Sequence, residues 1–145
     1  MMTEEQLAKI AWLNRAFHAE KNTKAWQAKL ERDRSLAERI SRSCSDGSEG
    51  SHDNSTEDAL IRLTRTEEET MARLQELVGI REEITSAIRI VEDQDMQSIL
   101  VRHYLAYETF ETIADKMHYD KRTIQRKHKK ALEEVVIVCH PESAL

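Results

Sequence analysis

The sequence has few residues that interrupt helices. Its 145 residues include three glycines (Gly47, Gly50 and Gly79) and one proline, Pro141. Glycine and proline are the strongest breaks in regular structure, so helices can run for many residues here. Aromatic residues make up 5% of the chain and charged residues 34%, which disfavours one compact core through the whole chain. We therefore expect an all-α protein built from long helices with narrow apolar faces.

Cysteines and long apolar runs are scarce as well. Cys44 and Cys139 form no C-x-x-C pair, so free thiols in a reducing cytoplasm are favoured over a zinc site or a disulfide. The longest apolar run, at 135–139, is far shorter than the roughly 20 residues that span a bilayer. The N-terminus lacks the basic and apolar regions of a signal peptide. These absences predict a cytoplasmic protein that contacts no membrane.

Motifs of catalysis are missing too. The sequence has no glycine-rich phosphate loop, no G-x-S-x-G and no H-E-x-x-H. None of the six histidines has another four residues away, although His103 and His118 could meet in space. We therefore expect no enzyme activity, no metal and no cofactor.

The charges that are present are unevenly distributed. The formal net charge is −5. Residues 57–95 carry eleven acidic and five basic side chains, a net −6, whereas residues 102–130 carry eight basic and four acidic ones, a net +4. This split is typical of a local surface that binds anions, and not of a protein that is basic throughout.

The N-terminal half predicts a helical arm over residues 1–42. Thr3 and Gln6 fit a capping box at its start, and the arm is one helix or two in line. An apolar stripe is expected along it, made of Leu7, Ile10, Ala11, Asn14 and Phe17. Residues 43–56, rich in Gly, Ser, Asp and Asn, predict a flexible linker.

Residues 57–92 predict a long acidic helix opened by Ser55 or Thr56. Apolar residues recur along it in steps of three and four, as in a coiled-coil seam. Two arrangements fit this pattern equally well: an antiparallel hairpin with the first helix, or a stalk that pairs two chains. The predicted seam residues are Leu60, Leu63, Glu67, Thr70, Leu74, Leu77, Arg81, Ile84, Ile88 and Val91.

Residues 93–138 predict three shorter helices, near 95–106, 109–118 and 120–136, before a tail at 139–145. Thr109 and Asp120 are suited to cap the second and third helices. Phe110, Ile113, Ala114 and Met117 form one apolar face, and Ile124, His128, Ala131, Leu132 and Val135 form another. The opposite side of the third helix carries hydrogen-bond donors: Arg122, Thr123, Arg126, Lys129 and Lys130, flanked by Lys121 and Gln125.

The order of residues from 100 to 132 resembles the region-four helix-turn-helix of sigma factors. Leu100, Tyr104, Thr109, Phe110, Ile113, Ala114, Ile124, Ala131 and Leu132 fall at matching positions of that pattern. Three positions near the turn depart from it: Met117 replaces Leu, His118 replaces Gly and Asp120 replaces Ser. Lys127 also stands where an apolar residue is common. Upstream, the chain resembles more loosely the sigma-like late-gene regulators of phages and prophages in Gram-positive hosts.

The resemblance implies a regulator that binds double-stranded DNA in a sequence-specific manner. The third helix would enter the major groove, with Lys121, Arg122, Thr123, Gln125 and Arg126 at the contact positions of region four. The N-terminal helices would serve dimerisation or contact with RNA polymerase. No segment resembles the region-two module that melts promoters, which disfavours an independent sigma factor.

Two other functions fit the same sequence. One is a DNA-packaging protein like the phage terminase small subunit, which joins a helix-turn-helix to an oligomerising region. The other is a helical interaction module that binds no DNA. The sequence leaves open the DNA target, the sign of regulation, the oligomeric state and whether the arm packs within one chain or between chains.

Overall fold

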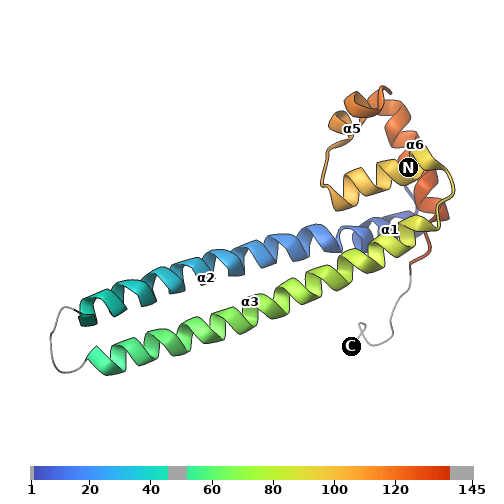
Figure 1. The fold of residues 1–145 in the computed structure, drawn as a ribbon. Coiled ribbons are helices and arrows are strands. Elements are labelled where there is room, and N and C mark those ends of the chain that lie inside the picture. The colour runs from blue at the N-terminus through green and yellow to red at the C-terminus, as the bar shows by residue number, and fades with distance from the viewer. Residues whose placement is uncertain (1, 46–51, 138–145) are drawn as a thin grey trace. The chain divides into compact units, whose positions relative to one another are not determined.

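The protein is all-α in the part that the structure describes, which confirms the predicted fold class. A computed structural model describes residues 2–45 and 52–137, and no strand occurs among them (Figure 1). The elements are α1 (Glu4–Leu13), α2 (Arg15–Ser45), α3 (His52–Arg89), α4 (Gln94–Leu100), the π-helix η1 (Val101–Leu105), α5 (Phe110–Met117) and α6 (Lys121–Glu134). Cys139 and the predicted tail lie outside the described residues, as does 46–51 of the predicted linker.

The chain divides into two compact units. Unit 1 combines Met1–His18 with Gly79–Leu145, and unit 2 is Ala19–Val78. The division falls inside α2 and α3, so each long helix contributes to both units. Unit 1 is therefore larger than the predicted 93–138 domain, because the two ends of the arm belong to it.

The first two helices begin as the sequence predicts but bury a different face. Thr3 and Gln6 form the reciprocal capping box of α1, and Asn14 interrupts the arm, which makes it two helices in line. The predicted stripe is wrong at Leu7, Ala11 and Phe17, which are exposed. The buried residues of this stretch are instead Gln6, Lys9, Leu13 and Ala16.

Unit 2 is an antiparallel pair of helices, formed by the parts of α2 and α3 within one chain (Figure 1). The Thr23 hydroxyl donates to the backbone carbonyl of Arg73 at 3.4 Å, and the Thr70 hydroxyl donates to that of Trp26 at 3.4 Å. From the first pair to the second, the residue number rises in α2 and falls in α3, so the two helices are antiparallel. The arm therefore forms an antiparallel hairpin within one chain, which is one of the two arrangements that fit the sequence.

The seam of α3 follows the predicted register only in part. Thr70, Ile84, Ile88 and Val91 are buried, as expected. Leu60 and Glu67 are exposed, and Ala59 and Thr66 are buried in their place. The helix also begins at His52, and not at Ser55 or Thr56. A small residue at the seam allows the two backbones to approach closely, which turns the larger neighbouring Leu60 outward.

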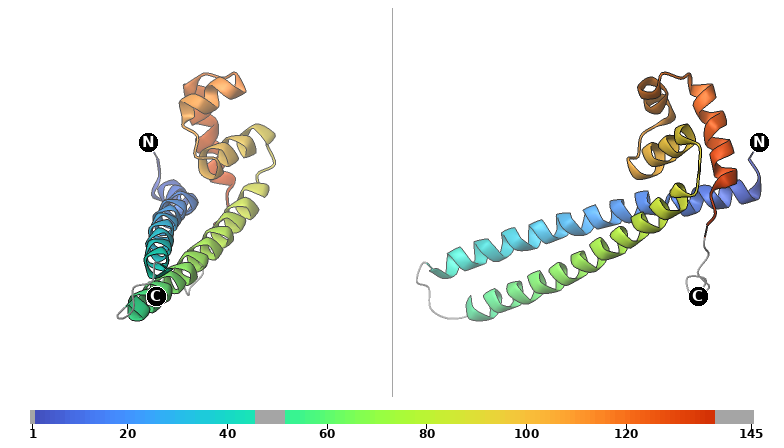
Figure 2. Two further views of the ribbon diagram at one scale, coloured as in Figure 1. Left: turned by 60° about the vertical axis from the view of Figure 1, so that its left-hand side comes forward. Right: turned by 45° about the vertical axis from the view of Figure 1, so that its right-hand side comes forward.

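The core of unit 1 joins segments that are distant in sequence. Leu13 and Ala16 pack with residues from the end of α3, from α4 and η1 and from α6; the other buried members are Ile84, Ala87, Ile88, Val91, Leu100, Tyr104, Ala131, Leu132 and Val135. A second, smaller cluster contains Ile99, Ile113, Ala114 and Ile124. Contacts of α6 with α1, α4 and α5 hold these parts together (Figure 2).

Two helix ends in unit 1 differ from the sequence prediction. The first short helix is α-helical only to Leu100 and continues as the π-helix η1, after which Tyr107 has a φ of 59°. The third helix ends at Glu134 and not near Val136, because Val135 adopts an extended conformation. Val135 is fully buried, so the chain leaves the helix in order to place this side chain in the core.

The turn between α5 and α6 depends on one residue in the left-handed region. His118 caps α5 with φ 62° and ψ 39°, and its N–H donates to the carbonyl of Ala114. This is the position at which helix ends favour glycine, as the resemblance anticipates. Side chains with a Cβ are strained there by about 1–2 kcal/mol, although histidine occurs there more often than most residues.

We predict that His118→Gly stabilises the protein by about 1 kcal/mol, because glycine adopts this conformation without a Cβ clash. Urea unfolding monitored by circular dichroism would measure the change. Asp115→Gly, within α5, is the matched control and should destabilise the protein by about 1 kcal/mol. Equal destabilisation by both substitutions would contradict the assignment of strain to His118.

Candidate nucleic-acid interface

The candidate interface is the two-helix unit of α5 and α6. Each helix starts at a side-chain cap, which fixes where it begins. The Thr109 hydroxyl accepts from the Thr112 N–H at 3.2 Å, and the Asp120 carboxylate accepts from the Thr123 N–H at 3.0 Å. Hydrogen bonds from Thr123 lower the pKa of Asp120, so this cap stays ionised. Both predicted caps are confirmed.

The inner face of α6 is buried as the sequence predicts. Ile124, Ala131 and Leu132 are fully buried, and His128 is nearly so. Ile124 packs in the cluster with Ile113 and Ala114 of α5, whereas Ala131 and Leu132 belong to the main core of unit 1. The helix is thus fixed against two sets of neighbours, and its rotation about its own axis is determined.

His128 is the polar member of this inner face. Its Nε2 lies 2.6 Å from the Tyr104 hydroxyl, and its ring packs against Phe110 with centroids 4.9 Å apart. Burial and, to a smaller extent, the nearby His103 lower the pKa of His128 to about 4. Burial also raises the pKa of Tyr104. The pair is therefore a neutral hydrogen bond at neutral pH.

His103 has neighbours other than the one expected. Its ring stacks on Phe110 with centroids 4.3 Å apart and lies 5.6 Å from His128, and its Nδ1 is 2.8 Å from the carbonyl oxygen of Glu108. The suggested meeting with His118 is wrong, because His118 is exposed at the end of α5. His103 thus supports the segment that leads into α5.

The outer face of α6 comprises the seven donor residues expected from the sequence. Lys121, Arg122, Gln125, Arg126 and Lys130 are exposed, and Thr123 and Lys129 are partly buried. All seven occupy one helix: Arg122, Thr123, Arg126, Lys129 and Lys130 lie away from the buried face, and Lys121 and Gln125 flank them. The structure therefore brings the predicted residues together on one surface, although these residues differ in how they are engaged.

Ion pairs divide the basic residues of this region into two groups. Lys121 binds Glu111 at 2.9 Å, which joins the start of α6 to α5. Lys116 and Arg102 both bind Glu108, at 2.6 Å and 3.4 Å, and lower the pKa of that carboxyl. These cations stabilise the scaffold. Within the described part of the chain, Arg122, Arg126 and Lys130 form no salt bridge with an acid, so their charges stay on the outer face.

A second tether was not expected from the sequence. The Tyr119 hydroxyl donates to Asp95 at 2.7 Å, and Lys127 approaches the same carboxylate at 3.8 Å. The Lys127 ammonium also lies 5.3 Å from the centre of the Tyr119 ring. Lys127 stands where the resemblance expects an apolar residue, and that departure was the signal for a polar contact. Asp95 and Tyr119 thereby join the start of α4 to the α5–α6 turn.

The far end of α6 is held from α1. The buried Lys9 donates from Nζ to the carbonyl oxygen of Leu132 at 2.8 Å and lies 3.4 Å from that of Glu133. A cation at the C-terminus of a helix satisfies its open carbonyl groups and complements the helix dipole. Sequence reasoning missed Lys9, because a lysine near an apolar stripe is usually solvated.

Arg81 ties the end of α3 to the segment after η1. Its guanidinium donates to the Leu105 carbonyl at 3.1 Å and to the Tyr107 hydroxyl at 2.8 Å. The Tyr107 hydroxyl in turn donates to the Ala16 carbonyl at 3.4 Å. Arg81, which the sequence places in the coiled-coil seam, therefore connects the end of α3 with the segment after η1 and, through Tyr107, with the start of α2.

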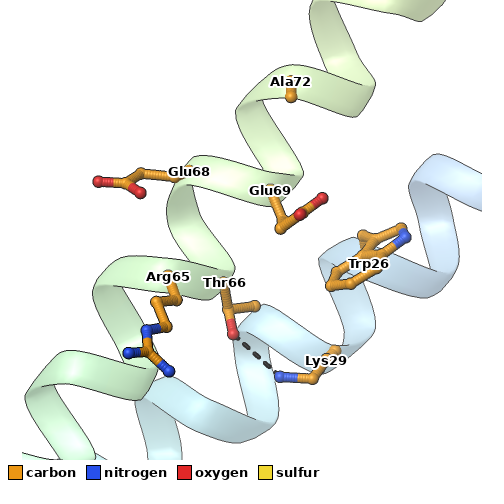
Figure 3. Close-up of a pocket in the computed structure, with 7 residues that line it drawn as sticks. All are labelled: Trp26, Lys29, Arg65, Thr66, Glu68, Glu69 and Ala72. Atoms are coloured by element: carbon orange, nitrogen blue, oxygen red, sulfur yellow. Dashed lines mark hydrogen bonds between the residues drawn. The ribbon is translucent and has the colours of Figure 1, made fainter.

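The described residues offer no group of three or more His, Cys, Asp or Glu side chains that could hold a metal ion. Within the same ranges, no helix is long and apolar enough to cross a membrane. A hollow of about 450 Å³ in unit 2 is lined by Trp26, Lys29, Arg65, Thr66, Glu68, Glu69 and Ala72 (Figure 3). Its charges of both signs neutralise one another, so it does not resemble a site for a small anion.

We predict that the free energy of unfolding falls as the pH is lowered from about 6.5 to about 4. In this range the unfolded chain protonates His128 more readily than the folded protein does, so the folded state loses about 3 kcal/mol by pH 4. Urea unfolding across the pH range would measure the slope. His128→Gln should flatten it, and an unchanged slope in that variant would assign the effect to other groups.

Comparisons with known proteins give one match. Neither a curated protein nor a solved structure matches the chain. Residues 39–136 match a protein family described as a protein of unknown function, DUF1492. The match covers the end of α2 and all of α3, α4, η1, α5 and α6, and hence the whole candidate interface. The chain belongs to the DUF1492 family.

Proposed function

We propose that the protein is a sequence-specific DNA-binding transcription regulator that places α6 in the major groove of double-stranded DNA. An α-helix has the diameter that this groove admits. The observation that carries the proposal is the separation of the basic side chains. The scaffold neutralises Lys116, Lys121 and Lys127 with acids, whereas Arg122 and Arg126 project from the outer face.

The side chains of the outer face suit different parts of DNA. Arg122 and Arg126 can each bridge O6 and N7 of a guanine, and Gln125, exposed between them, can pair with an adenine. Lys129 and Lys130 lie farther along the helix, where phosphate contacts would position the protein without selecting a sequence. The start of α6 offers the N–H groups of Lys121 and Arg122 to a phosphate.

The segment around the turn supports the resemblance to region four. The left-handed His118 stands where that pattern has glycine, and both caps occur where it has Thr and Ser. On this basis we assign the protein to regulators encoded by phages or prophages that act in the cytoplasm. The N-terminal helices would then contact RNA polymerase or a second copy, and the protein would act by binding and not by catalysis.

We predict that Arg126→Ala weakens binding to a selected DNA site by about 1–3 kcal/mol and relaxes the preference at one base pair. Fluorescence anisotropy with labelled duplexes at fixed salt would measure both effects. Arg65→Ala, which removes an exposed guanidinium from unit 2, is the matched control and should leave the affinity unchanged. Lys130→Ala should weaken binding to all sequences alike and reduce the salt slope by about 1.

Unchanged affinity of a folded Arg126→Ala protein would contradict the assignment of α6 to the groove. Salt-insensitive binding, or no binding, would favour the interaction module that binds no DNA. A ring-sized oligomer that binds DNA would favour the packaging protein.

A further inference from the structure

The helix pair of unit 2 buries very little apolar surface. Its buried residues are Thr23, Ala37, Ala59, Thr66 and Thr70, all of them small. No large apolar side chain among the described residues of this unit is buried, and Leu30, Leu63, Leu74 and Leu77 are only partly covered. Two helices that share so thin a core gain little from the burial that stabilises helical pairs in water.

The apolar surface that remains forms a stripe along α3. Leu60, Met71 and Val78 are 52%, 56% and 54% exposed, and Leu63 and Leu74 lie beside them partly covered. Positions 60, 67, 74 and 64, 71, 78 recur every seven residues, as in a coiled-coil seam. We refer to Leu60, Leu63, Met71, Leu74 and Val78 as the α3 stripe. It lies on a flank of the helix that α2 does not cover.

The neighbouring flank of α2 carries alternating charges in the same spacing. Its residues follow one another in steps of three and four: Glu20, Lys24, Gln27, Glu31, Arg34, Glu38 and Arg42. We refer to this set as the α2 charge row. Charged residues that border an apolar seam determine which helix pairs with it and in which direction.

The stripe and the charge row lie on one side of the helix pair. Trp26 and Lys29 of α2 line the open hollow together with Arg65 and Glu69 of α3, which marks the opposite side (Figure 3). Successive residues of an α-helix are about 100° apart around its axis. On α3, the stripe and Arg65 therefore lie on opposite sides of the buried Thr66. On α2, the charge row and Lys29 lie on opposite sides of Leu30. One continuous face thus has an apolar centre and a charged border.

We propose that this face binds the same face of a second copy of the chain, in antiparallel orientation, so that two helix pairs form a four-helix arrangement. The occupant follows from the charge row. When the row is reversed and laid on itself about Glu31, Glu20 meets Arg42 and Lys24 meets Glu38 of the second copy, whereas Glu31 meets its own copy. A surface that complements itself in this way fits a twofold dimer.

The α3 stripe complements itself about the same axis. Hydrogen bonds of Thr66 with Lys29 and Asp33, at 2.9 Å and 2.6 Å, place residue 66 of α3 opposite this part of α2. An axis at Glu67 then pairs Leu60 with Leu74, and Leu63 with Met71, of the second copy. Glu67 meets its own copy at the axis, and that like-charge contact weakens the pairing.

The first experiment measures the mass of the full chain in solution by sedimentation equilibrium, without DNA. The wild-type protein should be a dimer in the micromolar range, and Met71→Glu should shift it to monomer by raising the dissociation constant at least tenfold. Ala72→Glu is the matched control, since Ala72 is exposed and lines the hollow on the other side of α3. Glu67→Leu should tighten the dimer, because it replaces the like-charge contact at the axis.

The second experiment tests the orientation by exchanging charges. Lys24→Glu and Glu38→Lys should each weaken the dimer, and the double variant should restore it. Within one chain these residues are 14 positions apart on one helix, about 21 Å, so they cannot pair with each other. Restoration therefore requires contact between copies, and circular dichroism would verify that each variant is folded.

A monomeric wild-type protein would overturn the proposal, as would equal disruption by Met71→Glu and Ala72→Glu. A dimer that the double variant fails to restore would overturn the antiparallel register. None of these results depends on DNA binding, so failure here is distinct from failure of the proposed regulator.

Discussion

The orientation of α6 depends on the contact between Tyr104 and His128. Both side chains are buried, and each satisfies the polar atom of the other at 2.6 Å. An unpaired hydroxyl or imidazole in this position would cost about 1–3 kcal/mol, so the pair specifies one packing of η1 on α6. Because His128 faces inward, Arg122 and Arg126 face outward. The chemistry of the outer face is thus a consequence of a polar contact in the core.

The surrounding charges follow the same logic. Glu108, Glu111 and Asp95 each bind cations that would otherwise add to a diffuse positive surface. Exposed ion pairs contribute little to stability, at most about 1 kcal/mol each. Their effect here is geometric, since they join α4, α5 and the turn to α6. A protein with a net charge of −5 can therefore present one compact group of available donors.

The sequence was informative wherever structure depends on neighbours along the chain. The caps Thr3, Thr109 and Asp120 and the inner face of α6 were predictable, since each is set within four residues. The stripe through Leu7 and Phe17 was wrong, because the buried face runs through Gln6, Lys9, Leu13 and Ala16, where Lys9 binds the distant end of α6. Lys9 and the Asp95–Tyr119 tether were missed, since their partners are distant in sequence. The apolar spacing of α3 likewise could not predict that α2 covers Ala59 and leaves Leu60 exposed.

The proposed reading of bases by α6 in the major groove is tested most directly by methylation interference on a DNA site selected by the full chain from random duplexes. We expect methylation of guanine N7, in the major groove, to block binding at one or two positions. Arg122→Ala or Arg126→Ala should remove the block at one of them. Failure to select any sequence, or interference confined to adenine N3 in the minor groove, would contradict the proposed binding mode.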